Sequence, residues 1–434
     1  RPEKGFYGLL PETLFIIRLH NPELVNMSES AEQTRVFSKS FTRQEPIGEQ
    51  AIQAAVAILQ SGRIHRYNVG KDGISQVALL EKEFAGYMGK KYCLACASCG
   101  SAMYLALKSA GVKENEKILC NAYTLAPVPG AIENAGARIV LVEITDDYTI
   151  DFDDLAAKAK AEDVKWFMMS HMRGHMADMD KIVDICAQNH ITLIEDCAHT
   201  MGARWDGRLS GTFGAAACFS TQTYKHINSG EGGLLVTDDP DLIAKAIIYS
   251  GSYMNYDRHI SRPDDAVFDA IREIVPNYSC RMDNLRAAIL RPQIQTLDAQ
   301  CERWNRRYRL LESRLNQIPG IHCPGRDPKE QYVGSSIQFS LDTDNETVIR
   351  QFLDTCLARG VELKWFGNKK PVGFTSAYKS WKYFDNLPEL PNTDRILASM
   401  CDMRIPLTFD LADCEKIAQI IADVADQILS GEPV

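Results

Sequence analysis

The 434-residue sequence predicts an α/β protein with a large domain, built on a mixed and mostly parallel sheet covered by helices, and a smaller α+β C-terminal domain. Three observations support this fold class. From about residue 49, short apolar runs alternate with helical stretches. At roughly 150 residues per domain, the length allows two or three domains. Hydrophobic residues at 45% and charged residues at 24% are average for globular proteins, which excludes a disordered or fibrous chain.

Charge, apolar run length and cysteine content indicate which partners and which compartment to expect. The chain has 57 acidic and 48 basic residues, a formal charge of -9, without a basic cluster, so we expect no nucleic-acid partner. No apolar run approaches the ~20 residues that span a bilayer, so we expect no membrane association. Thirteen cysteines, an odd number scattered through apolar segments, are typical of reduced core thiols and predict a cytoplasmic protein.

The pattern predicts an irregular N-terminal extension over residues 1–45, a large domain over 46–300 and a small domain over 301–434. In the large domain we expect helices at 51–59, 75–88, 101–109 and 179–189, and strands at 92–97, 117–123, 138–144, 165–170 and 191–195. The closely spaced strands 216–221 and 233–237 are expected at the edge of the same sheet, followed by a helix at 239–249.

A long charged helix over 283–315 is expected to carry the domain boundary. The small domain then has predicted strands at 335–340 and 361–365. Its predicted helices span 346–358 and 412–429.

Cys93, Cys96 and Cys99 have the spacing of an iron–sulfur ligand run. A cluster needs a fourth ligand and an irregular loop, whereas this segment has strand composition, and strand alternation places Cys93 and Cys96 on opposite faces. We therefore favour core thiols and predict no metal site.

The segment Ser98-Cys99-Gly100-Ser101 closes a predicted strand and opens a helix. Free N–H groups at a helix N-terminus form a seat for phosphate, and glycine allows close approach. An ordinary helix cap is the alternative.

Asp196 and His199 follow the apolar strand 191–195. A carboxylate at this end of a strand faces the crevice where ligands bind in open α/β sheets, and it can hold a protonated ring nitrogen. A helix cap or a salt bridge is the alternative for Asp196, as is a structural role for His199.

Lys225 leaves a predicted strand just before a glycine-rich turn, where partial desolvation would make its amine nucleophilic. A solvated loop lysine is the alternative. A lysine for a Schiff base, an acid for a pyridine nitrogen and a helix N-terminus for a phosphate are together what pyridoxal phosphate requires.

Several motifs occur here in a characteristic order: Ser98–Ser101, Tyr123-Thr124, a segment from His171 of the form HxxG...DMD, Ile194–His199, Gly202-Ala203, Phe219-Ser220 before Lys225, and Gly230–Gly233. In this order the sequence resembles the DegT-type sugar aminotransferases over about residues 49 to 430. These are pyridoxal-phosphate enzymes of fold type I, the aspartate aminotransferase fold.

The resemblance implies a catalytic pair and a set of cofactor contacts. Lys225 forms the Schiff base, and Asp196 pairs with the pyridinium nitrogen. The implied cofactor-binding residues are Gly100, Ser101, Tyr123, Asp196, His199, Ser220, Lys225 and Ser279.

Two positions depart from the family pattern. Leu125 stands where the family has an aromatic residue that stacks on the cofactor, a role left to Tyr123. Ser279-Cys280-Arg281-Met282 replaces a segment whose asparagine reaches the phosphate of the neighbouring subunit, so we expect a homodimer with shared active sites.

The predicted function is transfer of an amino group from an amino acid, glutamate or glutamine, to a keto sugar or related polyol ketone, by a ping-pong route through a pyridoxamine form. The alternatives are a sugar dehydratase of the same fold, whose members lack the lysine, and a non-catalytic cofactor-binding regulator. His65, Arg66, Arg173 and His175 would suit either an acidic substrate or salt bridges.

Overall fold

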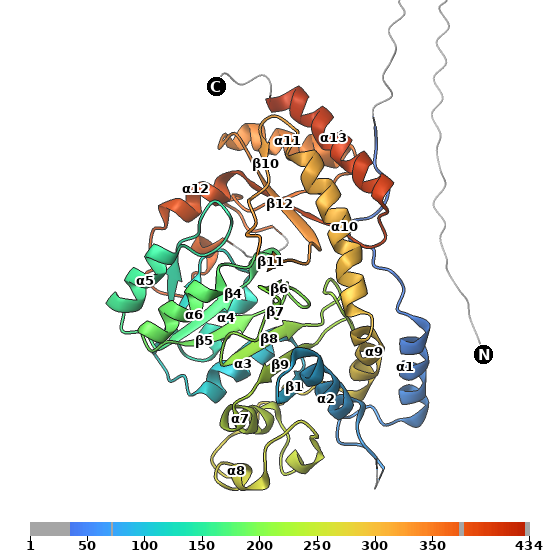
Figure 1. The fold of residues 1–434 in the computed structure, drawn as a ribbon, viewed down its shortest axis with the longest axis vertical. Coiled ribbons are helices and arrows are strands. Elements are labelled where there is room, and N and C mark those ends of the chain that lie inside the picture. The colour runs from blue at the N-terminus through green and yellow to red at the C-terminus, as the bar shows by residue number, and fades with distance from the viewer. Residues whose placement is uncertain (1–34, 71–72, 373–376, 430–434) are drawn as a thin grey trace, which may run out of the picture. The chain divides into compact units, whose positions relative to one another are not determined.

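A seven-stranded sheet forms the centre of the N-terminal two thirds of the chain (Figure 1). The computed structural model describes residues 35–70, 73–372 and 377–429. The strands follow the order β1-β9-β8-β5-β4-β2-β3. Their bounds are β1 (Tyr92–Cys96), β2 (Lys117–Asn121), β3 (Arg138–Val142), β4 (Trp166–Ser170), β5 (Thr192–Asp196), β8 (Ala216–Ser220) and β9 (Gly233–Thr237). Only β9 runs against its neighbours, which confirms the predicted mixed and mostly parallel sheet.

The predicted edge position of strands 216–221 and 233–237 is wrong. β9 lies between β1 and β8, and β1 forms the edge. Cys96 of β1 pairs with Gly233, and Tyr92 pairs with Thr237. The reversed β9 returns between two parallel strands, and this insertion depends on long-range pairing rather than on local spacing.

Helices cover both faces of this sheet. One core joins apolar residues of α2 (Gln76–Met88), α5 (Phe152–Ala161), α6 (Met179–Gln188) and α9 (Asn284–Ile294) with Cys93 of β1. The opposite core joins α3 (Cys99–Ala110), α4 (Pro127–Asn134) and α7 (Pro240–Ser250) with Cys96. Cys93 and Cys96 therefore lie on opposite faces, as strand alternation predicts, and all thirteen cysteines are unpaired.

The C-terminal part is built on a four-stranded antiparallel sheet in the order β10-β12-β14-β13. Its strands are β10 (Ile321–His322), β12 (Ser336–Leu341), β13 (Lys364–Trp365) and β14 (Met400–Arg404). The helices here are α10 (Leu297–Leu315), α11 (Glu346–Ala358), α12 (Pro391–Ser399) and α13 (Leu411–Leu429) (Figure 1). α10, α11 and α13 enclose one apolar core with this sheet.

The predicted helix 283–315 is two helices, α9 and α10. Pro292 lies in the last turn of α9, lacks an N–H and crowds the carbonyl one turn earlier, and the chain turns at Gln295 and Thr296. Trp304 of α10 belongs to the core of the large sheet, whereas Tyr308, one turn later, belongs to that of the small sheet. This division supports the predicted domain boundary near residue 300, which stays a prediction.

The remaining elements are short or peripheral. α1 (Glu49–Ser61) packs against α9. A small sheet joins β6 (Arg204–Trp205), β7 (Arg208–Leu209) and β11 (Glu330–Gln331), and α8 (Asp265–Asp269) and three 3-10 turns, Met172–Gly174, Tyr256–Arg258 and Tyr378–Ser380, complete the fold.

The predicted N-terminal extension is described only in part, because residues 1–34 lie outside the described residues. Residues 35–45 contain neither helix nor strand. Phe37 and Phe41 are buried in the core of the small sheet, and the Phe37 N–H donates to the carbonyl of Arg359 at 2.8 Å. This stretch is therefore held by the C-terminal part of the molecule.

Candidate active site

Asp196, the last residue of β5, is a buried carboxylate at the carboxyl end of the large sheet. Its Oδ2 accepts a hydrogen bond from the Ser170 hydroxyl at 2.8 Å, and its Oδ1 accepts one from the Ala198 N–H at 3.1 Å. Ser170 ends the neighbouring strand β4, so the parallel register brings the two side chains together. Burial raises the pKa of Asp196, although these hydrogen bonds and Lys225 oppose the rise. A cation beside the carboxylate would lower that pKa.

Lys225 lies in the turn that follows β8. Burial, with the charges of Arg173 and Arg404 as lesser causes, lowers the pKa of its amine to about 8, while Asp196 opposes the shift. At neutral pH an appreciable fraction of this amine is therefore neutral and nucleophilic, unlike that of an ordinary lysine.

The N-terminus of α3 lies beside these groups. Ser98 is the N-cap, and its hydroxyl accepts a hydrogen bond from the Ser101 N–H at 3.0 Å. Gly233 of β9 packs directly on this turn, since a Cβ there would lie 2.3 Å from the carbonyl carbon of Ser98. The strand thus fixes the helix terminus, whose first-turn N–H groups are the natural donors to an anion.

These features surround one cavity of about 330 Å³, here called the sheet cavity. It is lined by Ser98, Cys99, Gly100, Met103, Leu125, Pro127, Val128, Ser170, Met172, Asp196, Ala198, His199, Ser220, Gln222, Lys225, Glu231 and Gly232. The cavity offers N–H groups that can donate hydrogen bonds to an anion, a buried carboxylate that a cation would stabilise, and an amine of lowered pKa. This donor set fits the phosphate, ring nitrogen and aldehyde of pyridoxal phosphate.

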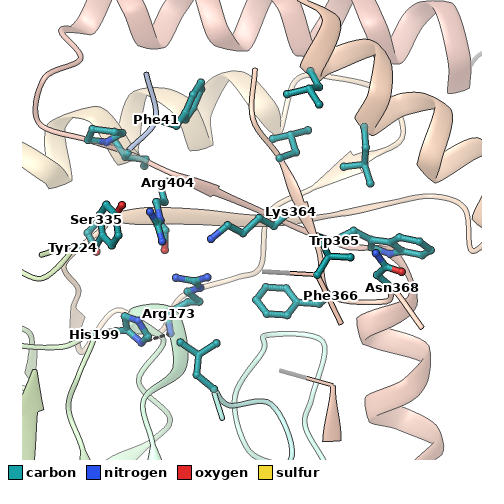
Figure 2. Close-up of a pocket in the computed structure, with 18 of the residues that line it drawn as sticks. Phe41, Arg173, His199, Tyr224, Ser335, Lys364, Trp365, Phe366, Asn368 and Arg404 are labelled. Carbon is teal, nitrogen blue, oxygen red and sulfur yellow. Dashed lines mark hydrogen bonds between the residues drawn. The ribbon is translucent and has the colours of Figure 1, made fainter. Parts of the chain in front are cut away.

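A second cavity of about 690 Å³, here called the wide cavity, shares Leu125, His199, Gln222 and Lys225 with the sheet cavity. Arg173, Lys364 and Arg404 also line it (Figure 2). Lys225 therefore stands where the two spaces meet.

His199 is buried at the same junction, and its Nδ1 accepts a hydrogen bond from the Arg173 N–H at 3.3 Å. Burial, together with the charges of Lys225 and Arg173, holds the pKa of this imidazole well below its usual range, so the ring is neutral.

The structure places five predicted residues, Gly100, Asp196, His199, Ser220 and Lys225, on the sheet cavity. The other three do not line it. Ser101 has its hydroxyl 3.0 Å from that of Ser98. Tyr123 is fully buried, with its ring edge-on to Phe366. Leu125 lines the cavity instead, so the suggestion that Tyr123 replaces the stacking aromatic finds no geometric support.

Ser279, the third of these residues, lies at a positive φ of 58°, and its hydroxyl accepts a hydrogen bond from Arg281 at 3.4 Å. Because it does not line its own chain's cavity, a phosphate contact by Ser279 requires a second chain.

The structure separates the four basic residues that the sequence offers for an acidic substrate. Arg66 is buried in a bidentate pair with Glu81, at 2.7 and 2.8 Å. His175 is buried, with Nε2 2.8 Å from the Gln338 side chain. Neither lines the cavities, nor does His65. Only Arg173 does.

Sequence reasoning missed several lining residues. Ser170 ends a predicted strand next to that of Asp196, so adjacent parallel strand ends were a usable signal. Lys364 and Arg404 come from β13 and β14 of the small sheet, and no local pattern connects them with Lys225.

His171, Glu195 and Cys197 form a buried group close enough to hold a metal ion. Glu195 also accepts hydrogen bonds from the N–H groups of Gly211, Phe213 and Gly214, at 2.7 to 3.0 Å. These bonds indicate that Glu195 holds the loop before β8.

Comparison with known proteins identifies the family, because residues 45–424 match the model of the DegT/DnrJ/EryC1/StrS aminotransferase family. The chain belongs to this family. It is a pyridoxal-phosphate-dependent aminotransferase, which confirms the predicted resemblance, enzyme class and cofactor.

Curated relatives include the spore coat polysaccharide biosynthesis protein SpsC of Bacillus subtilis. It is 30% identical over 66% of this chain and 73% of the relative. The L-glutamine:scyllo-inosose aminotransferase of Streptomyces griseus is 28% identical over 65% of this chain and 67% of its own length. Such names confirm the predicted enzyme class, an aminotransferase.

Solved structures confirm the fold. 3-Amino-5-hydroxybenzoic acid synthase is 25% identical and superposes with a TM-score of 0.76. The superposition covers 89% of this chain and 99% of that protein.

Helices long and apolar enough to cross a membrane do not occur within the described ranges.

Proposed function

We propose that this site moves an amino group from glutamate or glutamine to the ketone of a sugar or a related polyol, with Lys225 as the group that transfers the proton. The position of Lys225 carries the proposal: its amine has a pKa of about 8 and lies where the sheet cavity opens into the wide cavity. The glutamine donor and inosose acceptor in the name of the Streptomyces griseus relative support the substrate class.

Pyridoxal phosphate, when bound, supplies an electron sink that stabilises negative charge at the substrate carbon and stores the amino group between the two half-reactions. In its neutral form, Lys225 Nζ would take the proton from the donor's α-carbon and deliver it to the cofactor carbon that bears the amino group. In the second half-reaction it would carry a proton back from that carbon to the carbonyl carbon of the acceptor. The Asp196 carboxylate would hold a ring N–H by a charge-assisted hydrogen bond.

The groups around Lys225 and Asp196 position these two side chains and would bind the rest of the cofactor. The Ser170 hydroxyl and the Ala198 N–H fix both oxygens of Asp196, so the carboxylate cannot rotate away. Gly100 and the first turn of α3 would bind the phosphate, with Ser220 adding a hydroxyl. His199 stays neutral and adds no charge near the ring. The dehydratase alternative requires a site without the lysine, and Lys225 lines the cavity.

A homodimer with shared sites is part of the proposal. Large apolar side chains are exposed on one stripe of α1, where Ile52, Val56 and Leu59 are 44%, 43% and 53% exposed. Tyr253 and Met254, 54% and 61% exposed, lie near Ser279 in the fold, since the Tyr253 ring is 5.5 Å from the Arg281 guanidinium. Such surfaces are typical of interfaces.

The unpaired cysteines support a cytoplasmic location.

The test mixes the cofactor-loaded protein with single amino acids and follows the cofactor spectrum. Glutamate or glutamine should convert the aldehyde form to the pyridoxamine form, and a keto sugar or inosose should reverse the change. Failure of every amino donor to change the spectrum would contradict the proposal.

A further inference from the structure

A third cavity of about 380 Å³, here called the amide cavity, lies next to Lys225. Its walls come from the segment that leads into α1, the turn after β8, and the junction of α9 and α10 (Figure 1). Gln44 and Trp304 line both the amide cavity and the wide cavity, and Lys225 lines all three cavities. A ligand with one end at Lys225 can therefore extend into the wide cavity or into the amide cavity.

The lining of the amide cavity is rich in primary amides. The amide side chains are those of Gln44, Gln50, Asn228, Gln293 and Gln300. Gln293 has a structural role, because its Nε2 donates to the backbone carbonyl of Asn228 at 2.8 Å and its Oε1 accepts from the Asn228 N–H at 3.0 Å. These two bonds hold the turn after β8 against α9.

Other amides of this cavity have hydrogen-bonding groups to spare. The side chains of Gln50 and Asn228 form no hydrogen bond with another described residue. The Gln300 oxygen accepts a hydrogen bond from Arg303 Nη1 at 2.6 Å, which leaves the NH₂ group of Gln300 as a donor. A primary amide has two N–H donors and a carbonyl acceptor, so a free amide can both donate to a ligand and accept from it.

His226 is a buried side chain of the same lining that also lacks partners. It is 4% exposed, and neither ring nitrogen has a hydrogen-bond partner among the described residues. Burial, with the charge of Lys225 as a lesser cause, lowers the pKa of His226 to about 3, so the ring is neutral, with one donor and one acceptor nitrogen. The ring stands edge-on to Trp304, with 5.2 Å between centroids. A buried polar group without a partner is costly, and a hydrogen-bonding ligand relieves that cost.

The charges around the amide cavity disfavour an anion. Its acidic side chains are Glu49 and Glu45, and Glu45 forms a bidentate pair with Arg303 at 2.5 and 2.9 Å. Among the described residues, Lys225 is the only cation in this lining. The wide cavity differs, because Arg173 and Arg404 suit the carboxylate that every amino acid donor carries.

The amide cavity therefore matches a neutral polyol. A hydroxyl group both donates and accepts hydrogen bonds, as a primary amide does, so amides can bind neighbouring hydroxyls without a net charge. Trp304 adds apolar surface for the C–H groups of such a ligand. The volume lies within the range of about 300–1,000 Å³ found for small-molecule sites.

We propose that the amide cavity binds the hydroxyl-bearing carbons of a neutral acceptor and directs its ketone toward Lys225. The groups that bind the hydroxyls are the side chains of Asn228, Gln300 and His226. The donor's carboxylate lies in the wide cavity, so the two substrates of the ping-pong reaction occupy different spaces that meet at Lys225. This inference rests on the proposed aminotransferase function and assigns the acceptor a site of its own.

The test uses polyols without a ketone, because they cannot take up the amino group and their binding is measured apart from turnover. The probes are myo-inositol and D-glucitol, each titrated by calorimetry into enzyme loaded with pyridoxamine phosphate. At least one of them should bind the wild-type enzyme. An enzyme that binds neither polyol would overturn the inference.

Three variants then assign the bound polyol to the amide cavity. Asn228→Leu and Gln300→Leu remove amide groups, and His226→Phe keeps a flat ring beside Trp304 but removes both nitrogens. Each variant should weaken polyol binding about fivefold or more, as expected for the loss of a neutral hydrogen bond. Affinities within about twofold of wild type in all three variants would also overturn the inference.

Gln295→Leu is the matched control, because Gln295 is an amide at the same junction of α9 and α10 that does not line the amide cavity. This variant should bind the polyol like wild type. Conversion of the wild-type cofactor by glutamate, measured separately, needs no polyol and reports on the proposed function alone.

Discussion

At the residue scale, we expect the charge of Asp196 to contribute most to the reaction rate, because it keeps the ring nitrogen of the cofactor protonated. Asp196→Asn keeps the shape and one acceptor oxygen but removes the charge that favours a protonated ring nitrogen. We expect the variant to bind the cofactor and to lose several orders of magnitude in the rate of the donor half-reaction, measured by stopped-flow absorbance.

Ser170→Ala is the control for this substitution. It removes the 2.8 Å hydrogen bond but leaves the charge of Asp196, so it should cost about ten- to a hundredfold, the worth of one hydrogen bond to a charged group. A twofold loss in Asp196→Asn would show that Asp196 is only structural.

Lys225 gives a prediction about pH. Its pKa is about 8 in the folded protein and near 10.5 in an unfolded chain, so between these values the unfolded state binds more protons and stability rises with pH. In the cofactor-free protein, Lys225→Met should be stabilised relative to wild type below pH 8. This difference should shrink by up to about 3 kcal/mol as the pH rises to about 10.5, measured by urea unfolding. A difference that does not change with pH would contradict the lowered pKa.

The residues that could be predicted from sequence are those at strand ends. Asp196 ends the apolar strand β5, and Lys225 follows the apolar strand β8. The ends of these two strands therefore indicate where the side chains of Asp196 and Lys225 lie. Lys364 and Arg404 could not be predicted, because their approach to Lys225 depends on how the small sheet packs on the large one.

At the element scale, two glycines beside the first turn of α3, Gly233 of β9 and Gly100 of α3 itself, should behave differently. A Cβ at Gly233 would overlap the backbone of Ser98, so Gly233→Ala should destabilise the fold by about 1–3 kcal/mol and displace the helix terminus. A Cβ at Gly100 would meet only ordinary contacts, the nearest being Ser98 Oγ at 3.7 Å. Gly100→Ala should therefore keep the stability of the cofactor-free protein and weaken cofactor binding.

Thermal unfolding of the cofactor-free proteins and cofactor titration measure the two effects. If Gly100→Ala binds the cofactor like wild type, the first turn of α3 is not the phosphate site.

The existence of most elements follows from local pattern, but their arrangement does not. Apolar runs predict β8 and β9 within a residue of their bounds, yet the place of β9 between β1 and β8 is set by long-range pairing. Likewise, charge and periodicity predict helix over 283–315, whereas Pro292 divides it into α9 and α10.

At the scale of the whole molecule, we expect a homodimer in which Ser279 and Arg281 complete the partner's phosphate site. Lys225→Ala alone and a Ser279→Ala, Arg281→Ala double variant should each be nearly inactive. A mixed dimer places both defects in one site and leaves the other intact, so equal mixing after refolding or co-expression should restore up to about a quarter of wild-type activity.

Light scattering during dilution measures the assembly in parallel. A monomer with full activity would contradict the shared site, and a dimer without complementation would remove Ser279 and Arg281 from it.

Two lysines of the described chain, Lys225 and Lys364, have pKa values of about 8 and line the wide cavity, but only Lys225 also lines the sheet cavity with Asp196. Borohydride reduces a Schiff base between lysine and the cofactor to a stable secondary amine, which peptide mass spectrometry locates. The structure predicts the label on the peptide containing Lys225, unchanged in Lys364→Met and absent in Lys225→Ala. A label on Lys364, or on any other lysine of the wild-type enzyme, would contradict the assignment of the active site.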